Sequence, residues 1–180
     1  MKIPDSMESL LDLGGGDARL AIVLTEKFPR LKRIVSADIS EDMTRRAKFR
    51  ISQAGLSSII SASRQDVHKL TFDDGEFDAV VSFGALHHWK RPDIALAEAY
   101  RVLKPGCTIC VIDGYGRPSL SKIHKAVKSF GGSFAACIAY WCGSKDVLHQ
   151  NQISRIISDA CLPNIELTFD DFLATIRCTK

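Results

Sequence analysis

The feature that most constrains this 180-residue chain is the string LLDLGGGDA, in which a short apolar segment runs into three glycines. The segment Ser9 to Leu13 has the length and composition of a buried strand, and Gly14 to Gly16 follow it directly. A helix is expected from about Ala18 to Phe28, because apolar residues recur there at helical spacing until Pro29 stops it. A strand that feeds a helix through glycines lets the backbone approach a ligand at the carboxyl edge of a parallel sheet.

Short apolar runs alternate with longer amphipathic segments along the rest of the chain, which is the pattern of repeated βα units around a mostly parallel sheet. A second helix is expected to begin after Ser40 as its N-cap residue and to end at Gly55. Two more helices are expected, one from Pro92 to Leu103 and one around Ile153 to Ala160. The last two strands are separated by too few residues for a crossover helix and should be antiparallel. Further strands are expected at Arg33–Asp38, about Ile59–Arg64, Phe77–Phe83, Thr108–Asp113, Ile165–Phe169 and Phe172–Thr179.

Composition excludes several classes of protein. With 46% hydrophobic and 25% charged residues, the chain is typical of a soluble globular protein, and its apolar runs are far shorter than the ~18 residues of a membrane span. The first ten residues show no secretory signal, so a cytoplasmic location is expected. The net charge of +3 is modest and the basic residues are dispersed, so nucleic-acid binding is not indicated. Cys107 and Cys110 would point to opposite faces of a strand, so no metal site is expected.

The glycine string does not satisfy the dinucleotide-binding fingerprint. With Gly14 and Gly16 as the first two glycines, the third would have to be position 19, which is Arg19. A large cation there is unsuited to the close packing of helix on strand that the third glycine permits. The sequence therefore disfavours a nicotinamide-dependent enzyme.

The same string resembles the first motif of class I S-adenosylmethionine methyltransferases, in which an acidic residue precedes glycines at every second position. Asp12, Gly14 and Gly16 match that motif, and Ala18 replaces its third glycine. The resemblance implies that the loop, including Gly15, curves around the methionine part of S-adenosylmethionine. It also implies that the acidic residue acts on the ammonium side of this donor.

Two further matches follow in the order that the family shows. In VSADIS, the resemblance places Asp38 on both ribose hydroxyls, with Ile39 and Met43 beside the adenine. In SRQDVHKLTF, it places the carboxylate of Asp66 on the adenine amino group and the backbone N–H of Val67 on a ring nitrogen.

The block FDDGEFDAVVSFGALHHWKRPDIALAEAYRVLKPGC resembles the small-molecule, quinone-methyltransferase-like branch of the family. Ser82 and Phe83 would lie beside the methionine portion of the donor. His87 and His88 follow at the same edge and are the candidate proton acceptors, with positioning of the loop as the alternative role. The resemblance extends from about Leu10 to the end of the chain. It implies a Rossmann-like three-layer sandwich with a seven-stranded, mostly parallel sheet of order 3-2-1-4-5-7-6 and an antiparallel last strand.

The expected activity is transfer of a methyl group from S-adenosylmethionine to a small-molecule acceptor, with S-adenosylhomocysteine as the product. The alternatives are a donor-binding protein without transfer activity and methylation of a macromolecule. A third is metalloid methylation, because Cys137 and Cys142 lie close together in the sequence. Transfer itself needs mainly an aligned nucleophile in a site that excludes water.

Residues 1–180 are expected to form one methyltransferase domain, with an acceptor-binding insertion at residues 114–143. This segment leaves the sheet at the edge where ligands bind, and it is rich in aromatic residues such as Tyr140 and Trp141. Only about eight residues precede the first strand. The site would therefore be covered by the insertion or by another copy of the chain in a homo-oligomer, or it would be open.

Overall fold

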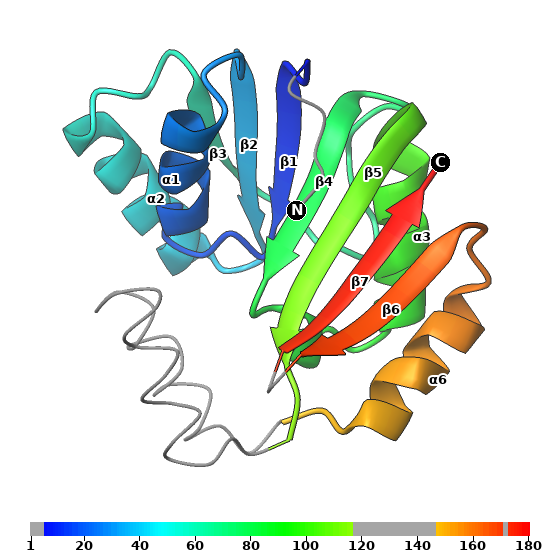
Figure 1. Cartoon of the computed structure of the whole chain (residues 1–180). Coiled ribbons are helices and arrows are strands. Elements are labelled where there is room, and N and C mark those ends of the chain that lie inside the picture. Colours follow the sequence, from blue (N-terminus) through cyan, green and yellow to red (C-terminus); the bar gives the residue numbers. More distant parts are fainter. Residues whose placement is uncertain (1–5, 117–146, 171–172) are drawn as a thin grey trace.

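The computed structural model describes residues 6–116, 147–170 and 173–180, and these form one seven-stranded sheet with helices on both faces (Figure 1). The strand order is β3-β2-β1-β4-β5-β7-β6. Neighbouring strands are parallel except at β7, which is antiparallel to both β5 and β6. The expected sandwich, strand order and antiparallel last strand are confirmed. Several expected element bounds are reproduced to the residue, including β1, β2 and β4.

The strands are β1 (Ser9–Leu13), β2 (Arg33–Asp38), β3 (Ile60–Arg64), β4 (Phe77–Phe83), β5 (Leu103–Gly114), β6 (Ile165–Asp170) and β7 (Leu173–Thr179). The helices are α1 (Arg19–Lys27), α2 (Glu41–Gln53), the short 3-10 helix η1 (Leu86–His88), α3 (Pro92–Val102) and α6 (Gln150–Ala160).

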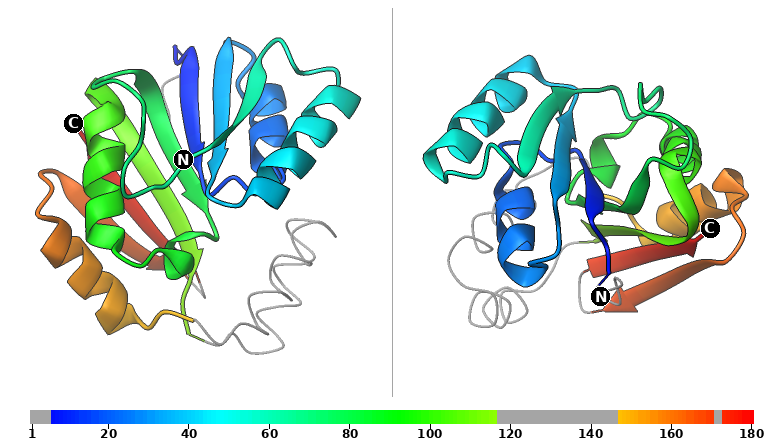
Figure 2. Two further views of the ribbon diagram at one scale, coloured as in Figure 1. Left: turned by 180° about the vertical axis from the view of Figure 1, so that it is seen from behind. Right: turned by 90° about the horizontal axis from the view of Figure 1, so that it is seen from above.

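Two hydrophobic clusters hold the layers together, one on each face of the sheet. Helices α1 and α2 cover one face, and α3 and α6 cover the other (Figure 2). Along β1 the side chains alternate between the clusters: Leu10 packs with the α1 and α2 residues, whereas Leu11 and Leu13 pack on the side of α3 and α6. Because β1 is buried on both faces, it fixes where its carboxyl end and the glycine loop lie.

The fifth strand differs from expectation, since β5 begins at Leu103 rather than at Thr108 and follows α3 without a loop. Leu103 pairs with Phe77, and the register then shifts before Ala79 pairs with Thr108. The end of the chain also holds this part of β5, because the Gly106 amide donates to the Lys180 carbonyl at 2.7 Å. Pro105 and Gly106, residue types that usually interrupt a strand, lie at this register irregularity.

The segment predicted to bind the acceptor, residues 114–143, lies outside the described residues except for residues 114–116. Tyr115 forms a parallel bridge with Leu148, and the Gly116 amide donates to the Leu148 carbonyl at 2.9 Å. The Tyr115 ring also meets the Phe169 ring edge-on, with 4.9 Å between centroids. The chain therefore leaves the sheet and returns to it at adjacent points.

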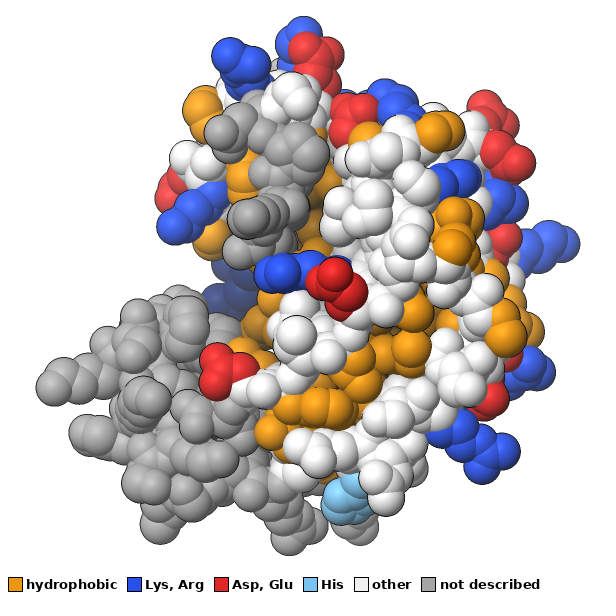
Figure 3. Space-filling model, turned by 45° about the vertical axis from the view of Figure 1, so that its right-hand side comes forward, with side chains coloured by type: hydrophobic (Ala, Val, Ile, Leu, Met, Phe, Trp, Pro, Cys, Tyr) orange, Lys and Arg blue, Asp and Glu red, His pale blue; other side chains and the backbone are white. Residues whose placement is uncertain are grey.

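On the side of the molecule seen in Figure 3, hydrophobic side chains reach the surface, and charged side chains lie mainly toward the edges of the view. Within the described part of the chain, no helix has the length and apolar character that crossing a membrane requires.

Asp78 on β4 ties the amino ends of the central strands together. Its Oδ2 accepts hydrogen bonds from the Glu8 and Ser9 amides at 3.0 and 2.8 Å, and its Oδ1 lies 2.7 Å from Lys104 Nζ. Burial opposes ionisation, but Lys104 and these donors outweigh it and lower the pKa of Asp78 to about 2.

We expect Asp78→Asn to lower the free energy of unfolding by about 2 kcal/mol at pH 7. Because the folded pKa is depressed, the stabilisation is present above about pH 4 and is lost as the pH falls toward 2. Denaturant unfolding at pH 7 and pH 3 measures this change. The control is Asp159→Asn, because Asp159 is exposed and its Oδ2 lies 3.7 Å from Arg155 Nε in a surface ion pair. A pH-independent loss would contradict the role of the Asp78 charge.

Candidate functional site

The parallel strands end at one edge of the sheet, the lower edge in Figure 1, where the glycine loop is fastened to the end of β2. The amides of Gly14 and Gly15 both donate to the Ala37 carbonyl, at 2.8 and 3.0 Å. The amide of Gly16 donates to Asp38 Oδ2 at 3.0 Å. Three successive loop amides are thus held by two consecutive residues of β2.

The loop needs glycines for two different reasons. Gly14 and Gly16 have φ values of +68° and +56°, a region that residues with side chains rarely adopt. Gly15 is required by space, because an added Cβ would overlap Ser36 Oγ and lie 2.6 Å from Asp12 Oδ2. The sequence pattern emphasised the alternate glycines and gave no signal for this second requirement.

Ala18 stands where the family motif has its third glycine, and it adopts the same left-handed conformation, with φ of 65°. The residue is fully buried at the start of α1. Alanine is accommodated at this point with backbone strain of about 1–2 kcal/mol. Arg19, the residue that excluded the dinucleotide fingerprint, begins α1, and its side chain is 61% exposed and paired with Asp17.

Asp12 is the most unusual residue of the site. It is 1% exposed, and neither carboxylate oxygen has a hydrogen-bond partner among the described residues. Burial, together with the charge of Asp38, raises the pKa of Asp12 to about 7, and the adjacent Ser36 hydroxyl offsets part of the rise. A buried, unpaired carboxylate is unfavourable by several kcal/mol and favours a cationic ligand group beside it.

Asp38 has a structural role that the sequence did not reveal. Besides holding Gly16, its Oδ1 accepts from the Ser40 amide at 2.9 Å. Each oxygen keeps a lone pair with which a ligand hydroxyl can bond. Ser40 is the N-cap of α2, as expected, and accepts from the Met43 amide at 3.3 Å. Asp38 therefore connects the glycine loop to the start of this helix.

Two large apolar side chains lie exposed next to Asp38. Ile39 is 60% exposed and Met43 is 38% exposed, although both are residues that normally prefer burial. Together they offer an apolar surface for the flat face of a ligand at the carboxyl end of β2. Contact of these two residues with adenine stays a prediction.

Asp66 and Val67 follow β3 at the same edge. The Asp66 Oδ1 accepts from the His68 amide at 3.0 Å and lies 2.6 Å from His68 Nδ1, contacts that lower the pKa of Asp66. The carboxylate is exposed and ionised, with Oδ2 outside these bonds. The Val67 side chain is buried in the core, so the prediction that Val67 contacts a ligand concerns its backbone N–H alone. The Gln65 amide donates to the Asp38 carbonyl at 3.0 Å, which joins this turn to β2.

Ser82 and Phe83 end β4, next to the glycine loop. The Ser82 hydroxyl is buried and donates to the Leu13 carbonyl at 2.7 Å. The hydroxyl proton of Ser82 is therefore engaged in a hydrogen bond that joins the ends of β1 and β4. Phe83 is half-buried and pairs with Ile112 across the sheet.

The two candidate catalytic histidines have different surroundings. The His87 side chain is 2% exposed, and its Nδ1 lies 2.9 Å from Oδ1 of the buried Asp113. The His87 amide also donates to Asp113 Oδ2 at 3.0 Å. His88 is exposed, and the centroids of the two rings are 4.0 Å apart. This arrangement positions η1 against β5 and fits the positioning role better than proton transfer, which stays a prediction.

The fold and this site define a Rossmann-like α/β protein whose sheet edge favours a ligand with a cationic group, hydroxyls and an apolar face. Residues 11–111, more than half of the chain, match the family described as the methyltransferase domain. The chain belongs to this methyltransferase family.

The relatives and solved structures agree with this assignment. The chain is 36% identical over 105 residues to a ubiquinone/menaquinone biosynthesis C-methyltransferase of Hydrogenovibrio crunogenus, covering 58% of this chain and 41% of that protein. It is 30% identical over 125 residues to the enzyme of that name from Pseudomonas putida, covering 69% and 48%. The chain thus spans about half the length of the curated relatives that it matches.

Two solved structures show the fold. A SAM dependent methyltransferase from Aquifex aeolicus superposes with a TM-score of 0.70 at 17% identity, over 95% of this chain and 81% of that one. The cyclase SpnF superposes with a TM-score of 0.67 at 22% identity, over 92% and 53%.

The two positive-φ glycines of the loop provide a matched pair of substitutions. A Cβ at Gly14 would overlap Ala85 Cβ, whereas a Cβ at Gly16 would meet nothing within 4 Å. We expect both alanine variants to lose about 1–2 kcal/mol of stability from φ, and Gly14→Ala to lose about 1–3 kcal/mol more from overpacking. Chemical denaturation measures the difference, and equal losses would contradict the close approach at Gly14.

Proposed function

We propose that this chain transfers a methyl group from S-adenosylmethionine to a small-molecule acceptor. The observation that carries the proposal is the buried Asp12 carboxylate, which lies against the glycine loop without a hydrogen-bond partner in the described structure. A donor with an ammonium group supplies the positive charge that this site lacks. The second carboxylate, on Asp38, adds to the negative potential.

The remaining residues fit the other parts of the donor. Asp38 would accept hydrogen bonds from the ribose hydroxyls, and the exposed Ile39 and Met43 would contact the adenine. Asp66 would accept from the adenine amino group through its outer oxygen. When bound, S-adenosylmethionine supplies an electrophilic methyl group on a sulfonium. The protein's task is to hold this group at the sheet edge, in line with the acceptor and away from water.

For the acceptor we propose a quinone-like small molecule. The support is the printed name of the relatives, which are C-methyltransferases of ubiquinone/menaquinone biosynthesis. The nucleophile would be a ring carbon of the reduced, hydroxylated form of such a molecule. This carbon forms the new bond to the methyl group and loses its proton, so a base is needed. The exposed His88, rather than the buried His87, is the better placed of the two for that task. A cytoplasmic location and a homo-oligomer stay predictions.

Donor binding without transfer is the second candidate function. This candidate is retained because the cyclase SpnF, which is named for a different reaction, has a similar fold. A turnover assay with a hydroxylated aromatic acceptor and labelled S-adenosylmethionine separates the two candidates. Methylation of the acceptor supports transfer, and tight donor binding without turnover across such acceptors supports the second candidate.

The donor assignment is tested by ligand-induced stabilisation. S-adenosylhomocysteine at 100 times its dissociation constant should raise the free energy of unfolding by about 2.7 kcal/mol, because it binds only the folded state. We expect no comparable effect from NAD or NADP, for which Arg19 stands at the wrong position. A thermal-shift measurement decides, and stabilisation by the dinucleotides alone would overturn the proposal.

The role of Asp12 gives opposite effects with and without ligand. Its pKa of about 7 is raised from 3.8, so the folded state holds a proton that the unfolded chain releases between about pH 4 and pH 7. Stability of the ligand-free protein should fall as the pH rises through this range, by roughly 3–4 kcal/mol at most. Asp12→Asn should abolish this fall and make the ligand-free protein more stable at pH 8.

The same substitution should weaken S-adenosylhomocysteine binding at pH 8 about tenfold or more, because the negative charge behind the glycine loop, which attracts the ligand's ammonium group, is lost. It should also remove the rise in affinity of the unmodified protein between pH 6 and pH 8. Calorimetric titration at both pH values measures this, with denaturant unfolding for the ligand-free state. Unchanged affinity with restored stability would place the ammonium elsewhere.

A further inference from the structure

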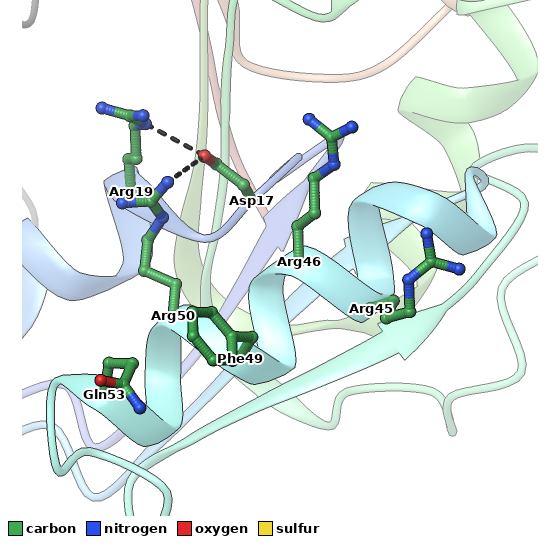
Figure 4. Close-up of a pocket in the computed structure, with 7 residues that line it drawn as sticks. All are labelled: Asp17, Arg19, Arg45, Arg46, Phe49, Arg50 and Gln53. Carbon is green, nitrogen blue, oxygen red and sulfur yellow. Dashed lines mark hydrogen bonds and ion pairs between the residues drawn. The ribbon is translucent and has the colours of Figure 1, made fainter.

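A second pocket, of about 650 Å³, lies on the outer side of α2, next to the segment between the glycine loop and α1 (Figure 4). We call it the arginine groove. In Figure 4, Arg50 extends from α2 to Asp17, beside Arg19, whereas Arg46 and Arg45 lie progressively farther along the helix from that pair. The lining residues are Asp17, Arg19, Arg45, Arg46, Phe49, Arg50 and Gln53.

The groove carries more positive charge than its acidic residues neutralise. Asp17 Oδ2 is shared by Arg19 Nε at 3.1 Å and Arg50 Nη2 at 2.7 Å. Asp42, on the same helix, is likewise shared by Arg45 and Arg46. Four guanidinium groups therefore face two carboxylates. Because each guanidinium has five N–H donors, many donors remain for an anionic ligand.

Arg50 shows that the present partners do not satisfy the groove. Its Nε is buried and has no hydrogen-bond partner among the described residues. An unsatisfied buried donor is unfavourable by about 1–3 kcal/mol. The Arg50 side chain as a whole is 40% exposed, and Asp17 bonds it through one oxygen at Nη2, so an anion in the groove can accept from its other Nη donors.

Phe49 adds an apolar surface to this charged site. Its side chain lines the groove and is 68% exposed, the highest exposure among the large hydrophobic residues described. It lies on α2 between Arg46 and Arg50 in sequence, opposite the buried Ala47 and Ile51. An exposed ring beside guanidinium groups suits a ligand that has an apolar or aromatic part as well as an anionic one.

We propose that the arginine groove binds a phosphorylated small molecule, with its phosphates on the guanidinium groups of Arg46 and Arg50 and its apolar part against Phe49. The volume is within the usual range for small-molecule sites. The site is distinct from the proposed donor site, because none of its lining residues is among those assigned to the donor. Its occupation is therefore independent of the methyl-transfer proposal.

Calorimetric titration of the whole chain with inorganic tripolyphosphate, and then with adenosine triphosphate, tests this at constant ionic strength. We expect saturable binding at one site, with tighter binding of the nucleotide because of Phe49. Arg46→Ala should weaken tripolyphosphate binding about tenfold, and Arg46→Lys should weaken it in part, because lysine keeps the charge but lacks the fork. Phe49→Ala should weaken binding of the nucleotide alone.

The matched control is Arg155→Ala, which removes a cation that is likewise paired with an acid at i,i+4, on α6, and is 84% exposed against 62% for Arg46. It should leave tripolyphosphate affinity unchanged, and S-adenosylhomocysteine affinity should be unchanged in Arg46→Ala. Equal weakening by Arg46→Ala and Arg155→Ala would show a nonspecific charge effect and overturn the proposal. Binding of phosphatidylglycerol vesicles without saturable binding of either soluble phosphate would assign the groove to a membrane surface and overturn it too.

Discussion

The site depends on the attachment of three consecutive glycine amides to the last two residues of β2. Gly14 and Gly15 bond to the Ala37 carbonyl, and Gly16 bonds to the Asp38 carboxylate. Because β2 pairs with β1 from Arg33 to Ala37, these contacts hold the loop against the strand that carries Asp38. The position of the glycine loop and that of Asp38 are therefore fixed by the same contacts, and neither can be changed without the other.

This rigidity explains how Asp12 can be buried without a partner. The carboxylate is surrounded by Gly15, Ser36 and core residues, so it cannot turn toward water to be solvated. Above its raised pKa, the unpaired Asp12 charge lowers the stability of the ligand-free protein. In contrast, the Asp78 carboxylate at the opposite edge has a full set of donors and stabilises the fold. Two acids near the ends of neighbouring strands thus have opposite effects because their surroundings differ.

Most of the sheet was predictable from the sequence, because the strands are short apolar runs bounded by turn residues and the N-cap Ser40 has a recognisable pattern. Features that depend on contacts distant in sequence were not. The early start of β5 follows from the pairing of Leu103 with Phe77, and the burial of His87 follows from its bond to Asp113. The spatial need for Gly15 and the gathering of arginines near Asp17 also arise only when separate elements are brought together.

The bridge between Tyr115 and Leu148 bears on how such a protein can diversify. The chain departs from the sheet and rejoins it at two adjacent backbone positions, so the polypeptide between them closes a loop on a fixed base. Changes in the length or composition of that polypeptide need not disturb the register of β5 with β4 and β7, since closure entropy varies only slowly with loop length. Recombination at these two positions would exchange the polypeptide between them while β1 to β5 are inherited intact. The same two positions are the natural junctions for building chimeric enzymes on this scaffold.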